Sequence, residues 1–223
     1  MESETPTRRV RVWDAPTRLF HWALVALLVA SYVTAEIDEL EWHMRAGYGV
    51  LALLLFRVVW GFVGSETARF SHFVRGPRAA WHHVRGFFEP APDVAVGHNP
   101  AGGWAVVALL LVLCVQVGTG LFADDDISEA GPFSQYVERP MRRWLTGLHD
   151  QSFNVLLGLA ALHVAAIGAY WLVRRHNLVW PMVTGVKRLP AEIVAPRQRR
   201  PVVAGLIFVV AASFAMWIAS LSE

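Results

Sequence analysis

The chain has 223 residues, of which 55% are hydrophobic and only 17% charged, and its formal net charge is +2. This composition indicates an integral membrane protein and excludes an ordinary soluble domain. The single cysteine, Cys114, lies inside an apolar run. Disulfide bonds, an iron–sulfur cluster and a covalent C-x-x-C-H haem site are therefore excluded. Basic residues lie between apolar runs, where membrane topology explains them, so no nucleic-acid partner is expected.

Five apolar stretches are long enough to cross a lipid bilayer, or nearly so. In chain order they are residues 19–35, 48–63, 104–122, 144–173 and 202–221. Each is predicted to be helical, because backbone groups in lipid must form hydrogen bonds within their own segment. The fourth stretch is longer than a span needs, so its first turn or two should emerge from the membrane. The fold class is therefore predicted to be all-α and integral to the membrane.

Lysine and arginine residues predict the orientation of these spans. They gather in the N-terminal tail, between the second and third stretches, and between the fourth and fifth. The residues are Arg8, Arg9, Arg11, Arg18, Arg69, Arg75, Arg78, Arg85, Arg174, Arg175, Lys187, Arg188, Arg197, Arg199 and Arg200. The opposite side has an acidic loop at 36–41 and a mixed loop at 124–143. We predict a bacterial inner-membrane protein with a cytoplasmic N-terminus and a periplasmic C-terminus, and an amphipathic helix at 75–88 on the cytoplasmic surface.

Four of the nine histidines fall at two matched depths in the predicted spans. His149 and His163 are fourteen residues apart, which is about 21 Å and just under four turns along one helix. His43 lies at the periplasmic depth of His149, and His21 at the cytoplasmic depth of His163. Each pair, His43 with His149 and His21 with His163, could supply both axial ligands of a b-type haem. Two imidazole ligands on one iron favour electron transfer.

Two alternatives remain open for these histidines. Any one of them alone could be a polar side chain that joins two helices by hydrogen bonds. A zinc or copper site is also possible, but it would need closer clustering and usually a third or fourth ligand. Ionisable groups within spans are costly and are commonly functional, which favours two haem sites.

Arginines and glycines near these depths are further candidates. Arg57 lies fourteen residues after His43, at the depth of His163, and could bind a haem propionate. Its alternative is to extend toward the membrane surface. Arg18, Arg45 and Arg142 are weaker candidates of the same kind. Several glycines could allow a flat macrocycle near the backbone or mark close helix packing: Gly47, Gly49, Gly118, Gly120, Gly147 and Gly158.

Gly97-His98-Asn99-Pro100 precedes the third stretch and has two interpretations. It is typical of a turn and helix entry, with Pro100 as the first helical residue. It could also place His98 and Asn99 at the headgroup level, where they would donate hydrogen bonds to a quinone carbonyl. The remaining histidines lie in basic segments outside the spans. His72, His82 and His83 are expected to be solvated or to face lipid.

Several motifs together resemble the bacterial cytochrome b561 family, which includes the b-type cytochrome subunit of nickel–iron hydrogenases. The resemblance covers about residues 10–187. The motifs are VWDAPTRLFHW at 12–22, His43 followed by Gly47-Tyr48, LFRVVWGFVGS at 55–65, GHNP at 97–100, TGLF at 119–122, Leu148-His149 and Leu162-His163. It implies a helical bundle in which His21, His43, His149 and His163 hold haem. We predict a four-helix haem-binding domain at 1–190 and an additional transmembrane helix at 201–223.

The resemblance implies electron transfer between the membrane quinone pool and a partner protein, using two haem b groups. The expected partner is a periplasmic redox protein, either a hydrogenase-type enzyme or a c-type cytochrome. An alternative is a superoxide:quinone oxidoreductase that acts on its own. Its periplasmic collecting surface could be formed by Arg45, Arg139, Arg142 and Arg143. A third possibility is a transporter or scaffold without haem.

Overall fold

The computed structural model of the protein describes residues 6–89, 92–125 and 129–221. The elements follow one another in the order β1 (Thr7–Arg11), α1 (Ala15–Glu36), α2 (Leu40–Val63), η1 (Glu66–Ala68), α3 (Phe70–Phe73), α4 (Pro77–Arg85), η2 (Gly86–Phe88), α5 (Pro100–Gly120), η3 (Ser134–Tyr136), α6 (Arg139–Leu172), α7 (Val179–Thr184), β2 (Val186–Pro190) and α8 (Pro201–Ala219).

Five helices of the described chain are long and apolar enough to cross a membrane: α1, α2, α5, α6 and α8. Each contains most of one stretch predicted from the sequence, and α1, α2, α5 and α6 begin about four to eight residues earlier than predicted. The longest, α6, has 34 residues, so it extends about 50 Å at 1.5 Å per residue. That length exceeds a hydrocarbon core of about 30 Å, so its first turns project beyond it.

Side-chain caps and prolines fix where two of these helices begin. The Asp14 side chain accepts a hydrogen bond from the Thr17 backbone amide at 2.8 Å, and Asn99 caps α5 by accepting from Gly102 at 2.7 Å. Pro100 is the first residue of α5, as the sequence predicts. Asp14 also accepts a hydrogen bond from Trp60 Nε1 at 3.1 Å. This second bond ties the start of α1 to the end of α2.

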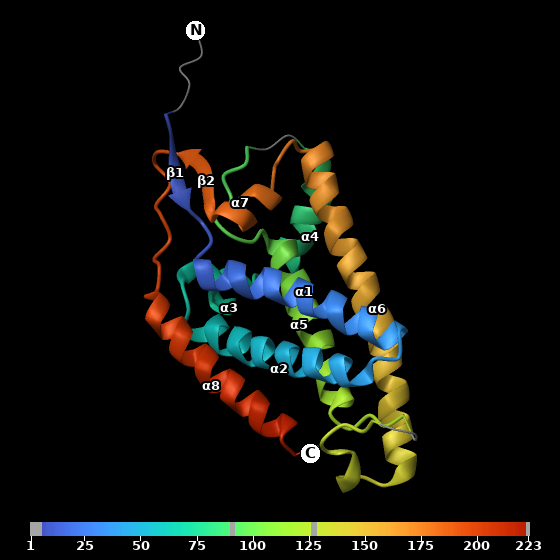
Figure 1. The fold of residues 1–223 in the computed structure, drawn as a ribbon. Helices are drawn as coiled ribbons and strands as arrows, with labels where there is room; N and C mark the ends of the chain where they lie inside the picture. The colour runs from blue at the N-terminus through green and yellow to red at the C-terminus, as the bar shows by residue number, and fades with distance from the viewer. Residues whose placement is uncertain (1–5, 90–91, 126–128, 222–223) are drawn as a thin grey trace.

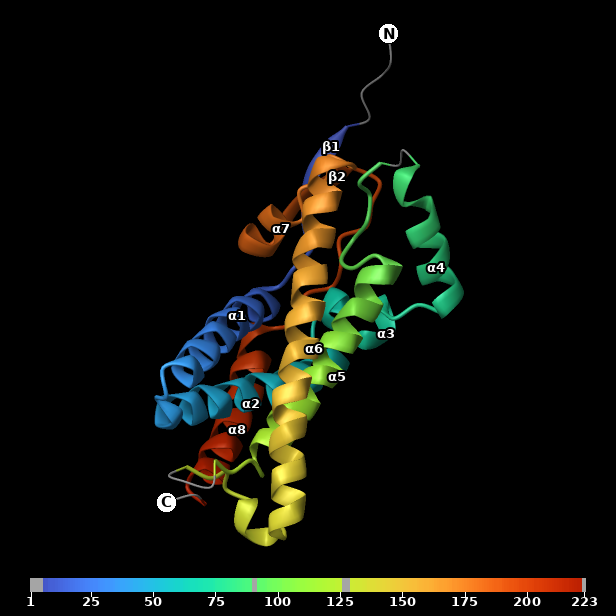
Figure 2. The same ribbon diagram turned by 90° about the vertical axis from the view of Figure 1, so that its right-hand side faces the viewer.

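The transmembrane helices form two groups. Helices α1, α2 and α8 lie side by side with α2 in the middle, and α5 and α6 form a second pair that crosses them obliquely (Figures 1 and 2). Helix α2 contacts α5, whereas among the described residues α6 makes few backbone contacts with α1 or α2. The core between α2 and its neighbours centres on the fully buried Trp60 and on Phe56. Contact between α6 and the pair α1 and α2 is therefore made mainly by side chains.

A two-stranded antiparallel sheet joins the N-terminal segment to the chain after α6. Strand β1 pairs with β2, with Arg9 opposite Arg188, and the buried side chains Val10, Val12 and Leu189 form a small core below it. The prediction of a purely helical chain missed this sheet. Its two strands are about 180 residues apart in sequence, and each is only five residues long, so no local pattern reveals their pairing.

The molecule has two ends, a sheet end and a loop end. The sheet end carries β1, β2, α4 and α7, and the loop end carries the α1–α2 turn and residues 121–125 and 129–138, which precede α6 (Figure 1). The predicted amphipathic helix at 75–88 is observed as α4 followed by η2 at the sheet end. Its exposed apolar side chains include Trp81, Val84 and Phe88. This exposure is what a helix lying at a membrane surface requires.

Candidate functional site

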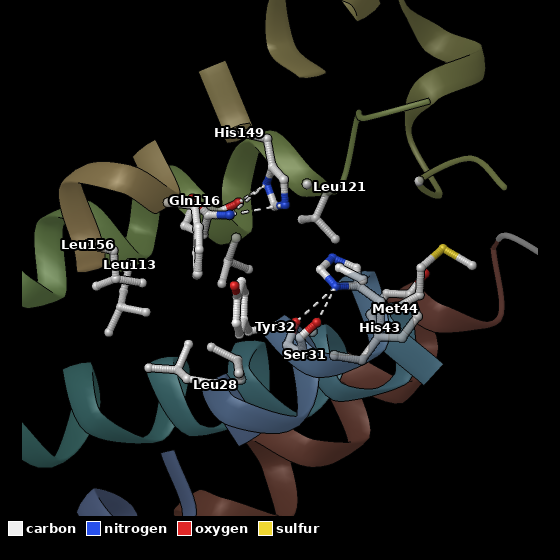
Figure 3. Close-up of a pocket in the computed structure, with 18 of the residues that line it drawn as sticks. Leu28, Ser31, Tyr32, His43, Met44, Leu113, Gln116, Leu121, His149 and Leu156 are labelled. Carbon is white, nitrogen blue, oxygen red and sulfur yellow. Dashed lines mark hydrogen bonds between the residues drawn. The ribbon is translucent and has the colours of Figure 1, made fainter. Parts of the chain in front are cut away.

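His43 and His149 face each other at the loop end. His43 lies in the first turn of α2 and His149 lies about three turns into α6. Their ring centroids are 6.1 Å apart and the ring planes meet at 82° (Figure 3). Metal–imidazole bonds are about 2 Å long, so two rings that bind one metal from opposite sides have centroids about 6 Å apart. The spacing of these two rings therefore fits one metal centre between them.

Hydrogen bonds from neighbouring helices orient both rings. His43 Nδ1 lies 2.8 Å from the backbone oxygen of Ser31 on α1, and His149 Nδ1 lies 2.8 Å from that of Gln116 on α5. A carbonyl oxygen only accepts hydrogen bonds, so each Nδ1 must carry the proton. The lone pair of each neutral imidazole is consequently on Nε2. A metal-binding histidine typically has this arrangement, in which the second ring nitrogen donates to a carbonyl.

A cavity of about 290 Å³ lies between these helices and contains both rings. Its wall is mostly aliphatic and aromatic, from α1, α2, α5 and α6 (Figure 3). Gly47 lines it with no heavy atom within 4 Å of where a Cβ would be, whereas a Cβ at Gly120 would lie 2.8 Å from His149 Cε1. Among the glycines that the sequence suggested, Gly47 thus leaves space beside the cavity, and Gly120 allows His149 its position.

His21 on α1 and His163 on α6 lie close enough to interact electrostatically at the sheet end. The Nδ1 atom of His21 is buried and has no hydrogen-bond partner among the described residues. The structure thus brings together the same pairs that depth in the sequence predicts, His43 with His149 and His21 with His163. Within the described chain, no group of three or more His, Cys, Asp or Glu side chains converges on a possible metal position.

Arg57 lies buried near this second pair, with only 3% of its surface exposed. Its guanidinium carbon lies 5.0 Å from the ring centre of Phe70, 5.9 Å from that of Phe73 and 6.0 Å from that of Phe20. The Nη1 atom is buried without a hydrogen-bond partner in the described structure. A buried cationic donor of this kind is costly unless an anionic acceptor joins it. Arg57 therefore does not extend to the membrane surface, and a carboxylate such as a haem propionate would fit it.

Arg18, one turn before His21, has a different environment. Its Nη1 donates to the backbone oxygen of Val183 in α7 at 2.5 Å, while its Nε is buried without a partner. Arg18 thus anchors α7 and still has one donor for an anionic group. Of the weaker candidates at the loop end, Arg142 pairs with Asp124 at 2.6 Å and Arg45 pairs with Glu41.

His98 and Asn99 lie between the sheet end and α5. The His98 ring is packed between Trp13 and Phe73, each at a centroid distance of 4.7 Å. Burial, and then the positive charge of Arg57, lower the pKa of His98 to about 3. Its neutral imidazole has a buried Nδ1 without a partner in the described structure. Asn99 caps the start of α5, as the helix-entry interpretation of this motif predicts. Its amide nitrogen also donates to the hydroxyl of Tyr170 at 3.0 Å.

Several contacts at both sites were not predicted. His83, which was expected to be solvated or to face lipid, is half-buried, and the contact of its Nε2 with the Tyr170 hydroxyl oxygen at 2.5 Å was not predicted. Tyr170 itself was not singled out, because a tyrosine at a span end is typical of an interfacial anchor. Gln116 was also missed, although its side chain contacts His149 Nε2 at 3.0 Å and accepts from Ser152 at 2.5 Å. A glutamine inside an otherwise apolar span was the available signal.

Residues 12–185 match the prokaryotic cytochrome b561 family. The chain belongs to the prokaryotic cytochrome b561 family. Helix α8 lies beyond the matched residues. Cytochromes b561 are b-type cytochromes of the membrane, so membership implies a multi-pass membrane protein, a haem b cofactor and electron transport.

Curated relatives of this cytochrome b561 carry one description, probable Ni/Fe-hydrogenase B-type cytochrome subunit. The protein of Azotobacter chroococcum mcd 1 is 29% identical over 212 residues, which cover 79% of this chain and 87% of the relative. That of Azotobacter vinelandii has the same identity and coverage. The hydrogenase 1 subunit of Escherichia coli K12 is 26% identical over 196 residues, covering 75% of this chain and 83% of the relative. No solved structure matches the chain significantly.

Proposed function

We propose that this cytochrome b561 holds two haem b groups and carries electrons across the bacterial inner membrane, between the quinone pool and a periplasmic redox enzyme. The observation that carries the proposal is the facing pair His43 and His149. Both Nδ1 atoms donate to backbone carbonyls, and the rings are separated by the distance that one metal requires. A haem bound by two imidazoles supplies a one-electron carrier whose iron has no open position for oxygen chemistry.

The two proposed haem sites lie at two different depths in the membrane. His43 and His149 would hold the loop-end haem, and His21 and His163 the sheet-end haem. Because His149 and His163 lie on one continuous helix, α6 fixes the separation between the two sites at about 21 Å along its axis. Arg57 and Arg18 would bind propionates of the sheet-end haem through donors that have no partner among the described residues.

The basic residues at the sheet end support an orientation in which that end lies in the cytoplasm. Quinone would bind there, at the headgroup level, beside His98 and Asn99. Both residues support this placement, because a buried ring nitrogen of His98 has no partner in the described part of the chain and the side-chain amide of Asn99 donates to Tyr170. The two donors could recognise a quinone carbonyl.

The partner would contact the loop end, where the haem of His43 and His149 lies near the surface. The relatives described as hydrogenase cytochrome subunits support a nickel–iron hydrogenase as that partner. The superoxide alternative has less support. Arg142 pairs with Asp124 and Arg45 with Glu41, and Arg139 and Arg143 also have interactions, so these residues offer little unpaired positive charge to collect an anion.

The test uses the purified full chain in detergent. The protein should contain two haem b groups per chain by absorbance and iron analysis, and a quinol should reduce both. A single haem, or none, would refute the two-site proposal. If the haems were reduced by superoxide faster than in the uncatalysed reaction while a quinol had no effect, the proposed exchange with quinol would be wrong.

A further inference from the structure

A hydrogen-bonded cluster at the sheet end surrounds the hydroxyl group of Tyr170, near the last turn of α6. The Asn99 amide nitrogen lies 3.0 Å from this oxygen and His83 Nε2 lies 2.5 Å from it. The phenol ring also packs against Phe87, with a centroid distance of 5.2 Å, and stacks on His176 at 6.4 Å. Three segments that are distant in sequence therefore meet at one hydroxyl group: α4, the start of α5 and the end of α6.

Chemistry fixes the direction of the hydrogen bond between Asn99 and Tyr170, and the tautomer of His83 sets that of the bond between Tyr170 and His83. Asn99 Oδ1 already accepts from the Gly102 backbone amide at 2.7 Å, so the side-chain atom nearer Tyr170 is the amide nitrogen, which only donates. The Tyr170 oxygen must accept this bond. When His83 carries its proton on Nδ1, its Nε2 accepts the Tyr170 proton. The chain of bonds thus runs from Asn99 through Tyr170 to His83.

His83 is in the protonation state that this direction requires. Burial, and then the nearby positive charge of Arg174, lower the pKa of His83 below its ordinary value of 6.5. Neighbouring charged groups have hydrogen bonds or ion pairs of their own. Arg174 donates to the Glu89 backbone oxygen, and Asp93 pairs with Lys187 at 2.5 Å and lies 3.7 Å from His176. At neutral pH, His83 is therefore an uncharged imidazole that can take up a proton.

We propose that Tyr170 and His83 form a relay that carries protons between a quinol bound beside Asn99 and the cytoplasm. The inference rests on the proposed exchange with the quinone pool and names the groups that handle its protons. Tyr170 is the inner residue of the relay. His83 is the outer residue, because it lies half-buried on the surface helix α4, whereas Asn99 positions the hydroxyl group.

The relay accounts for every proton and electron of the reaction. When quinol is oxidised, its O–H bond breaks and the proton passes to the Tyr170 oxygen as the Tyr170 O–H proton moves to His83 Nε2. The resulting imidazolium releases a proton from Nδ1 to water. The two electrons leave one at a time to ferric haem, the acceptor that the proposed function supplies. Proton exchange with water then returns His83 to the tautomer that carries its proton on Nδ1 and has a free lone pair on Nε2. A second transfer along the same bonds releases the second proton, and quinone reduction is the reverse.

The test measures haem reduction by duroquinol in the purified, haem-loaded full chain, using stopped-flow absorbance across a range of pH. Tyr170→Phe should lower the maximum rate by at least about tenfold, the lower part of what positioned proton transfer contributes. The KM for duroquinol, the affinity for duroquinone in equilibrium dialysis and the rate of haem reduction by dithionite should not change. The matched control is His82→Ala, which removes the exposed neighbouring histidine of α4 and should retain the wild-type rate.

His83→Ala provides the second variant, which decides the outcome if Tyr170→Phe fails to fold or to bind haem. In the wild type the rate should rise with pH as His83 loses its proton and should become constant near neutral pH. His83→Ala should lose this dependence, react slowly at pH 7 and recover with added imidazole. The relay would be overturned if both variants reacted like the wild type, or if imidazole failed to restore His83→Ala. A wild-type protein that did not react with duroquinol at all would instead refute the proposed exchange with quinone.

Discussion

The imidazole rings of His43 and His149 lie 6.1 Å apart with their planes at 82°, although His43 lies in the first turn of α2 and His149 lies within α6. Neither ring is held by its own helix. Ser31 of α1 orients the first and Gln116 of α5 orients the second, both through backbone carbonyl oxygens. Four helices therefore cooperate to align two nitrogen atoms. This alignment leads to the following predictions.

Removing either member of a histidine pair should remove one and the same haem. His43→Ala and His149→Ala should both lose the loop-end haem and keep the other, because a haem with one axial ligand is weakly held. His21→Ala and His163→Ala should show the complementary loss. Redox titration of the haem absorbance of each variant would assign the components by their midpoint potentials. If His43→Ala and His21→Ala lost the same component, the pairing would be incorrect.

Two glycines of α5 provide a matched pair of variants at the loop-end site. In Gly120→Ala the new methyl group would lie 2.8 Å from His149 Cε1, so the ring must move away from its position. Gly118→Ala adds the same methyl group where no heavy atom lies within 4 Å. We expect Gly120→Ala to reduce the occupancy of the loop-end haem and Gly118→Ala to leave it unchanged. Haem content per chain, measured by absorbance, is the readout, and equal content in both variants would contradict the expectation.

Arg57→Leu should lower the midpoint potential of the sheet-end haem. A buried positive charge stabilises the reduced iron, which carries one positive charge less, and the guanidinium is only 3% exposed, so solvent screens it weakly. The expected decrease is on the order of 50 mV, which corresponds to roughly tenfold in the equilibrium constant of a one-electron couple. Redox titration measures it. Arg45→Leu, which removes an exposed charge paired with Glu41, should have a much smaller effect.

Asp14 should contribute more to stability than any ordinary surface carboxylate. It caps α1 and also accepts the Trp60 indole N–H, so Asp14→Ala leaves two donors without their partner. We expect the free energy of unfolding to fall by about 1–3 kcal/mol. Thermal unfolding in detergent, followed by circular dichroism, would show it as a lower midpoint. Glu39→Ala is the control, because Glu39 precedes α2 without a side-chain cap bond and should change stability by less than about 0.5 kcal/mol.

His98 should make the folded protein less stable in acid. Its pKa is about 3 in the folded protein, against 6.5 as an ordinary histidine, so between these values the unfolded chain binds more protons. Its contribution to stability is complete above pH 6.5 and falls with decreasing pH by at most about 1.4 kcal/mol per pH unit. His98→Phe should therefore flatten the fall of the unfolding midpoint between pH 6.5 and 4.5. An unchanged slope would contradict the buried, neutral state of His98.

The amino-acid sequence by itself determined the spans and the depths of the candidate ligands. Runs of apolar residues are local in sequence and must form helices in lipid, so their number and approximate limits follow from composition alone. A helix has a constant rise, so the spacing between His149 and His163 translates directly into depth. Together with the positions of His21 and His43, this spacing predicts the two histidine pairs, and the rings of His43 and His149 face each other in the structure. The motifs at 12–22 and 55–65 were sufficient to indicate the family.

Tertiary structure alone decided the contacts made between segments that are distant along the chain. Tyr170 meets His83 across 87 residues, β1 pairs with β2 near the opposite end of the chain, and Arg57 is enclosed by Phe20, Phe70 and Phe73. Such contacts depend on how helices and loops pack. A short polar motif at a membrane surface can be solvated or buried, and its sequence alone does not distinguish the two. A periodic pattern gives the depth of a residue and its face on the helix. Only the packed structure gives its neighbour, and the proposed proton relay depends on that neighbour.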